Sequence, residues 1–201
     1  VLGFKAFMSH SGIDEFPKVA ESHLRKALSI LVNQAIPVLV HAEIENGVET
    51  SNSNQTYESF QATRPKSWEN NAIKLLIQLC REYETHIHIV HLSSSDILPE
   101  ISQTRNEGFP LTVETCPHYL HFSSERISNG DTRFKCAPPI WGADNREKLW
   151  AGLEKGTIDF ITSDHSPCAP ELKKLDTGDF QMAWGGISSI QFTLPVIWTE
   201  C

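Results

Sequence analysis

The chain has 201 residues, of which 40% are hydrophobic and 21% are charged, a composition typical of a folded globular protein with a sizeable core. Its formal net charge of −8 opposes binding to nucleic acid or to an anionic membrane surface. No apolar run approaches the roughly 20 residues that span a bilayer, and we expect no signal peptide. The composition therefore excludes a disordered or coiled-coil chain and predicts no nucleic-acid or membrane partner.

The cysteines are odd in number and lack the paired spacing of a metal-binding or redox motif. We therefore predict reduced thiols in an intracellular protein, located in the cytoplasm or, in a eukaryote, in the peroxisome or mitochondrion. The chain begins with Val1, already inside a strand pattern, so we expect it to be the interior or C-terminal part of a longer protein. The five cysteines are Cys80, Cys116, Cys136, Cys168 and Cys201.

Apolar strand-like runs alternate with helical patterns along the chain, which predicts an α/β protein with a parallel sheet and crossover helices. Ser67 is the expected N-cap of one helix, and Gly108 and Gly156 are expected just beyond the ends of two others. Longer polar loops are expected at 46–65 and 117–143. The predicted strands are 1–8, 36–42, 87–93, 110–116 and 158–163, and the predicted helices are 18–34, 68–84, 95–107, 144–155 and about 186–198.

Every predicted strand carries an ionisable side chain at or near its carboxyl end. In a TIM barrel that end is the catalytic face. Two further histidines, His86 and His88, have the opposite parity to His91, so alternation predicts that they face away from it. The polar residues at successive strand ends are Lys5, His41 with Glu43, His91, Glu114 with His118, and Asp164 with His165.

Each of these residues alone has an ordinary structural explanation. A single strand-terminal histidine is commonly structural, Asp164 could cap a turn, and Lys5 could point to water from an edge strand. Together, two histidines, an aspartate and a lysine form a nitrogen and oxygen ligand set suited to zinc. An ammonium has no lone pair for a metal, but the neutral amine of a buried Lys5 could add carbon dioxide. The resulting carbamate could bridge two cations.

The order strand-Lys, strand-His, strand-His, strand-Asp resembles the cyclic-amide branch of the amidohydrolase superfamily, which contains dihydroorotases, hydantoinases, dihydropyrimidinases and allantoinases. The stretches FKCAPPI (134–140), SDHSPCAPELK (163–173) and AWGGISSIQ (183–191) resemble allantoinases most. The resemblance implies a TIM-like (β/α)8 metal-dependent hydrolase barrel, of which residues 1–201 form a partial catalytic domain with about strands four to eight. The family's His-x-His motif does not precede Lys5, so we expect the first three strands to lie outside this chain.

The resemblance also implies the roles of the site residues. Carboxylated Lys5 would bridge two divalent metal ions, most simply zinc, with His41 and His91 on one ion and Asp164 on the other. Asp164 would be the catalytic residue that moves a proton from the attacking water to the leaving amide nitrogen. The implied reaction is opening of the hydantoin ring of (S)-allantoin to allantoate, in purine breakdown, by a homotetramer. The implied substrate contacts are Cys136, Ala137, His118, His165 and Ser166.

Other readings remain open from the sequence. A dihydropyrimidinase, hydantoinase or dihydroorotase would use the same ligand order, and a scaffold relative of the superfamily would use none of it. Glu43 and Glu114 could orient metal ligands, and Trp141 stands where the family commonly has arginine. Five open strands leave unpaired edges, so we expect the chain alone to be inactive and poorly soluble.

Overall fold

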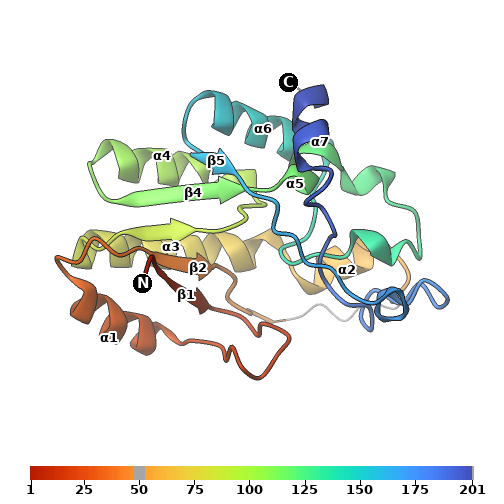
Figure 1. The fold of residues 1–201 in the computed structure, drawn as a ribbon, viewed down its shortest axis with the longest axis horizontal. Coiled ribbons are helices and arrows are strands. Elements are labelled where there is room, and N and C mark those ends of the chain that lie inside the picture. Colours follow the sequence, from red (N-terminus) through yellow and green to blue (C-terminus); the bar gives the residue numbers. More distant parts are fainter. Residues whose placement is uncertain (48–52, 201) are drawn as a thin grey trace.

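A parallel sheet forms the centre of the computed structural model, which describes residues 1–47 and 53–200 (Figure 1). Its five strands are hydrogen-bonded in sequence order, and every neighbouring pair is parallel. All five strands fall inside the ranges predicted from the sequence, and the α/β class is confirmed. The strands are β1 (Phe4–Phe7), β2 (Val38–His41), β3 (Ile87–Ile89), β4 (Leu111–Thr115) and β5 (Phe160–Ile161).

Crossover helices follow the strands, and four of the five predicted helices are present, with ends that differ from the predicted bounds by one to three residues. Gly108 and Gly156 have positive φ angles of 90° and 69° just beyond two of them, as expected. No helix within the described residues is both long and apolar enough to cross a membrane. The helices are α1 (Glu21–Leu31), α2 (Tyr57–Thr63), α3 (Lys66–Tyr83), α4 (Leu98–Asn106), α5 (Pro117–His121), α6 (Ala143–Glu154) and α7 (Thr193–Glu200).

The structure corrects three predictions about helices. The residue before α3 is Pro65, so Ser67 lies inside the helix and does not cap it. The predicted loops at 46–65 and 117–143 contain α2 and α5. The last helix begins at Thr193 and not near 186, because the preceding segment pairs with the chain after β5: Ile187 forms a bridge with His165.

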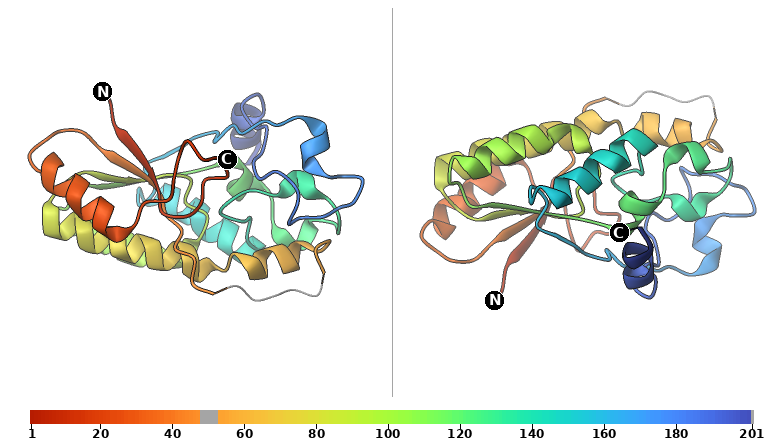
Figure 2. Two further views of the ribbon diagram at one scale, coloured as in Figure 1. Left: turned by 90° about the horizontal axis from the view of Figure 1, so that it is seen from below. Right: turned by 90° about the horizontal axis from the view of Figure 1, so that it is seen from above.

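The sheet buries one face completely. Val40, Ile87, Ile89 and Val113 are no more than 1% exposed, and α3, α4 and α6 gather on this side of the sheet (Figure 2). Alternate residues of each strand point to this face, so it is continuous across the central strands. Burying each such side chain stabilises the fold by about 1.5–3 kcal/mol, which makes this face the main core.

The opposite face of the sheet is open in this chain. The register pairs Lys5 with Leu39, Leu39 with His88, and His88 with Thr112, so these four side chains share that face. Polar groups are paired along it, since His88 Nε2 lies 3.1 Å from Glu114 Oε2. The open face leads directly to the carboxyl ends of the strands.

Candidate active site

A cavity of about 670 Å³ opens at the carboxyl ends of the strands. Its lining includes all four predicted metal ligands: Lys5 lies within β1, His41 ends β2, and His91 and Asp164 follow β3 and β5. Three of the five predicted substrate contacts, Cys136, Ala137 and Ser166, also line it. The fold therefore brings together residues that lie up to 159 positions apart in the sequence, Lys5 and Asp164.

His41 and His91 form a close pair of histidines in this cavity. His41 Nδ1 lies 3.0 Å from His91 Nε2, and both side chains are buried. Two nitrogens bound to one tetrahedral zinc ion at about 2.0–2.1 Å lie roughly 3.3 Å apart, close to this separation. The pair thus has the spacing that a shared divalent ion requires.

Glu43 orients His41 from behind. Its Oε2 lies 2.7 Å from His41 Nε2, which leaves His41 Nδ1 directed at His91. Burial raises the pKa of Glu43, but the hydrogen bond from His41 and the charge of Arg64 outweigh it, so the pKa lies below its usual value. Arg64 also donates to both Glu43 oxygens. A histidine held by an ionised carboxylate is the usual arrangement behind a metal-binding imidazole.

His91 lies just beyond the end of β3 with a positive φ of 42°, a conformation that costs a non-glycine residue energy. This turn breaks the strand alternation, so the parity argument for His86 and His88 was wrong: His88 shares the face of Lys5, and His91 turns toward His41. Burial lowers the pKa of His91 well below its usual value, so the ring is neutral. Its Nδ1 has no hydrogen-bond partner among the described residues.

Two buried side chains hold the turn that carries His91. Glu69 accepts hydrogen bonds from the backbone N–H groups of Ser93 and Ser94, at 2.9 and 2.7 Å. Asn145 accepts from the Ser95 N–H at 2.9 Å and donates to the Ser93 carbonyl at 2.8 Å. Burial raises the pKa of Glu69 to about 8. Nothing in the sequence pattern identified these two residues, because their partners come from other elements.

Lys5 lines the cavity and is exposed. Burial of the ammonium lowers its pKa to about 8, although the negative charges of Asp164 and Glu114 act in the opposite direction. The ammonium also lies 5.1 Å from the centre of the Phe7 ring. A lysine with this pKa has a substantial neutral fraction near physiological pH, and only the neutral amine can react with carbon dioxide.

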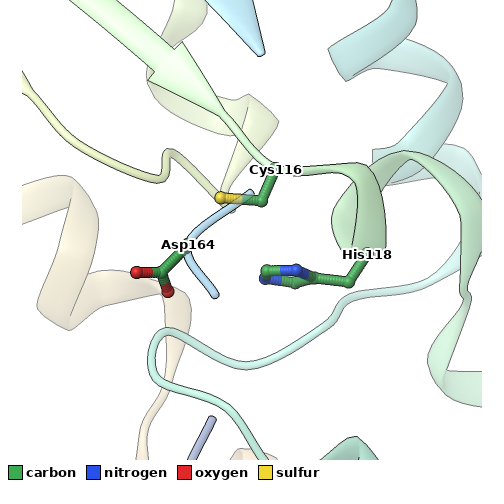
Figure 3. A group of neighbouring side chains, drawn as sticks. All are labelled: Cys116, His118 and Asp164. Atoms are coloured by element: carbon green, nitrogen blue, oxygen red, sulfur yellow. The ribbon is translucent and has the colours of Figure 1, made fainter. Parts of the chain in front are cut away.

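Asp164 follows β5 with a positive φ of 41°. Burial raises the pKa of Asp164, and the positive charge of Lys5 only partly offsets this. Its carboxylate, Cys116 Sγ and a ring nitrogen of His118 all lie within 4.8 Å of one another (Figure 3). His118 is fully buried, its pKa is lowered to about 3, and neither ring nitrogen has a partner among the described residues. Cys116 and His118 therefore adjoin the same centre as Asp164.

The remaining predicted contacts differ in position. Cys136 Sγ is 3.3 Å from the Pro138 carbonyl, and burial raises its thiol pKa to about 12, so it is not a thiolate nucleophile. His165 is outside the cavity lining, and its Nδ1 accepts hydrogen bonds from the Ser189 and Ile190 N–H groups at 3.1 and 3.2 Å. Glu114, considered as an orienting carboxylate, bonds to the side chains of His88 and Thr162, and a hydrogen bond from the His91 backbone also lowers its pKa.

These residues fit a divalent metal centre. The cavity presents imidazole nitrogens, a carboxylate and an amine of lowered pKa, the donor types that zinc accepts. Both ring nitrogens of His118, which lies beside Asp164, have no hydrogen-bond partner among the described residues. Buried polar atoms without partners are rare in proteins, and they mark sites where a ligand or ion completes the structure.

Comparison with known proteins identifies close relatives. The chain is 49% identical to an allantoinase of Arabidopsis thaliana over 99% of this chain and 42% of the relative. It is 47% identical to an allantoinase of Aquarana catesbeiana described as mitochondrial, over 100% of this chain and 42% of the relative. An allantoinase of Saccharomyces cerevisiae is 42% identical over 100% of this chain and 45% of the relative. The chain therefore spans less than half the length of these relatives.

Solved structures agree in fold. An L-hydantoinase (dihydropyrimidinase) from Arthrobacter aurescens matches 98% of this chain and 45% of its own, with a TM-score of 0.87 and 26% identity. A dihydropyrimidinase from Brevibacillus agri matches 98% of this chain and 44% of its own, with a TM-score of 0.86 and 25% identity. No protein-family model matches the chain. On this sequence and structural similarity, the chain belongs to the allantoinase family within the amidohydrolase superfamily.

Proposed function

We propose that the protein hydrolyses a cyclic amide in a metal-dependent reaction and that its substrate is allantoin, which opens to allantoate. The observation that carries the proposal is the convergence of Lys5, His41, His91 and Asp164 on one cavity at the carboxyl ends of the strands. The allantoinase relatives supply the substrate class, and the cavity supplies residues able to perform the chemistry.

The proposed cofactor is a pair of divalent cations, with zinc as the expected metal. Lys5, converted to a carbamate by carbon dioxide with loss of one proton, would bridge the two ions. His41 and His91 would hold one ion, and Asp164 would hold the other. When bound, the ions would polarise the amide carbonyl and activate water for attack.

The side chains of this chain perform the remaining tasks. Asp164, whose pKa is raised by burial, is suited to take a proton from the attacking water and pass it to the leaving nitrogen. Glu43 fixes the orientation of the His41 ring. Cys136, Ala137 and Ser166 form part of the substrate wall, and a ring nitrogen of His118 lies within 4.8 Å of the Asp164 carboxylate. The protonated thiol of Cys136 makes a covalent cysteine mechanism a poor alternative.

The test uses the complete encoded protein, purified with its metal content measured. Turnover of allantoin is compared with that of hydantoin, dihydrouracil and dihydroorotate. We expect the highest kcat/KM for allantoin and loss of that activity when the metal is removed by a chelator, with recovery on adding zinc. A metal-loaded protein that leaves allantoin intact would refute the proposed substrate.

A hydantoinase or dihydropyrimidinase is the second candidate, because a solved enzyme of that kind matches with a TM-score of 0.87. Its signature would be faster turnover of hydantoin or dihydrouracil than of allantoin. A preference for dihydroorotate would instead indicate the third member of the branch. A purified protein without bound metal or any of these activities would indicate a scaffold relative.

The quaternary structure and location stay predictions. We propose a homo-oligomer, with a tetramer as the expected form, and light scattering on the complete protein measures it. We also propose an intracellular location, either cytoplasmic or within the peroxisome or mitochondrion of a eukaryotic cell. Among the described residues, Cys80, Cys116, Cys136 and Cys168 are free thiols, which is compatible with that location.

A further inference from the structure

One wall of the cavity is formed by the segment 181–186, which lies between β5 and α7 in the sequence. Met182, Ala183, Trp184, Gly185 and Gly186 all line the cavity. This segment belongs to no helix or strand, so no regular hydrogen-bond ladder holds it. Its conformation must therefore be fixed by side chains from other parts of the chain.

Lys135 holds the first half of this wall. Its ammonium donates to the Gln181 and Ala183 carbonyls at 3.1 and 2.7 Å. The Lys135 carbonyl accepts a hydrogen bond from the Gly186 N–H at 2.8 Å. Lys135 directly precedes Cys136 and Ala137, which also line the cavity, so this residue joins their segment to the 181–186 wall.

Lys173 holds the second half. Its ammonium donates to the carbonyls of Trp184 (3.1 Å), Gly186 and Lys135 (3.4 Å), which uses all three of its donors. Gly186 also packs closely against Ser166, because a Cβ atom on Gly186 would lie 2.5 Å from Ser166 Oγ. Gly186 has a φ of 134°, which further restricts this position to glycine.

Both ammonium groups are unusual in lacking an anionic partner. Neither Lys135 nor Lys173 forms an ion pair within the part of the chain that the structure describes. The backbone carbonyls are instead their hydrogen-bond partners, and burial lowers the pKa of both lysines, that of Lys135 to about 8. The ammonium group of an ordinary surface lysine is hydrated or forms an ion pair. The ammonium groups of these two lysines instead donate hydrogen bonds to backbone carbonyls of the cavity wall.

We propose that Lys135 and Lys173 are positioning residues that fix the 181–186 wall and thereby set which substituent on the substrate ring the cavity accepts. The proposal rests on the proposed hydrolysis of allantoin, a hydantoin that carries a ureido substituent. In this proposal the metal ligands act on the ring amide and the wall contacts the ureido substituent, since both line the same cavity. Loosening the wall should therefore weaken binding of the substituted ring more than attack on the ring itself.

The experiment compares Lys135→Met and Lys173→Met with the wild type in the complete encoded protein. Methionine keeps the length of the side chain but removes the donors. We expect kcat/KM for allantoin to fall by about tenfold to a hundredfold, mainly through KM, while kcat/KM for unsubstituted hydantoin changes by less than about threefold. Lys173→Arg, which keeps the charge, should recover part of the loss.

Lys148→Met is the matched control, because Lys148 is 57% exposed and pairs with Asp144 on α6, away from the cavity. Hydrogen exchange gives a readout that does not need turnover: amides at 181–186 should exchange faster in the two variants and not in the control. If the wild type leaves allantoin intact, the proposed function fails, and the exchange data still test the lysines. Equal losses for both substrates, or unchanged exchange at 181–186, would overturn the positioning role.

Discussion

The covered face of the sheet and its carboxyl edge are built in opposite ways. The covered face is apolar, fully buried and regular. Val40, Ile89 and Val113 lie in register on it, on three neighbouring strands. At the carboxyl edge, His91 and Asp164 adopt positive φ angles and buried nitrogens lack partners. The covered face thus supplies the stability of the fold. The carboxyl edge carries backbone strain and unpaired polar atoms, whose energetic cost the core offsets. Changes in the two regions should consequently alter different measurable quantities.

The largest expected effect on activity comes from the carboxyl edge. Replacing Lys5 with methionine removes the proposed bridging ligand, and we expect kcat/KM of the complete protein to fall by about 10³-fold or more. The reason is that bound metal contributes several kcal/mol to the transition state, and each 1.4 kcal/mol is about tenfold in rate. Metal content, measured by atomic emission, should fall in parallel.

Lys26→Met is the control for this change, because Lys26 is an exposed lysine on α1. The control should retain wild-type turnover and metal content. Full activity in Lys5→Met would show that the lysine is an edge residue and not a ligand. The melting temperature of Lys5→Met should stay close to that of the wild type, as the comparison of the two regions requires.

The covered face should show the reverse pattern. Ile89 is fully buried, and Ile89→Ala should lower the free energy of unfolding by about 2–5 kcal/mol through lost burial and an internal cavity. Ile30→Ala is the matched control, since Ile30 is 69% exposed and should change stability little. Urea denaturation measures both. Equal effects at the two isoleucines would contradict the assignment of this face as the core.

The fold was predictable from the sequence because each buried strand is a short apolar run that can be recognised without its neighbours. Apolar runs separated by amphipathic helices give all five strands and four of the helices without knowledge of their partners. The predictions that were wrong depend on tertiary contacts. The segment before α7 is not helical because Ile187 pairs with His165, and Ser67 lies inside α3 because the helix begins after Pro65.

Only those residues of the candidate site that lie on or just after a strand could be predicted from the sequence. Lys5, His41, His91 and Asp164 were identified because polar residues at successive strand ends gather at one edge of a parallel sheet. The supporting residues could not be found this way, because Glu69, with its buried carboxylate on α3, shows its role only once Ser93 and Ser94 are seen against it.

An intermediate effect is expected at the support of His91. Glu69→Gln keeps the shape of the side chain but replaces one acceptor oxygen with an NH₂ donor, so only one of the hydrogen bonds from Ser93 and Ser94 can remain. We expect zinc affinity to fall by about 10–100-fold, the usual result of changing a residue behind a metal ligand. Competition with a chromogenic chelator measures the affinity without needing turnover. Glu154→Gln on α6 is the exposed control, and equal affinity in Glu69→Gln and this control would remove Glu69 from the site.

A pH-dependent effect on stability joins the two regions, because Glu69 lies in the core and supports the edge. Burial raises its pKa to about 8 in the folded state, above the usual value, so the native protein holds a proton that the unfolded chain releases between these two values. This contribution to stability is complete below the unfolded-state pKa and is lost as pH rises through about 8. The free energy of unfolding of the wild type should therefore fall relative to Glu69→Gln by up to about 1.4 kcal/mol per pH unit between pH 5 and 8. Urea denaturation of both proteins at several pH values tests this, and parallel curves would mean that Glu69 is ionised in the native state, held by its backbone N–H donors, and that burial does not dominate its titration.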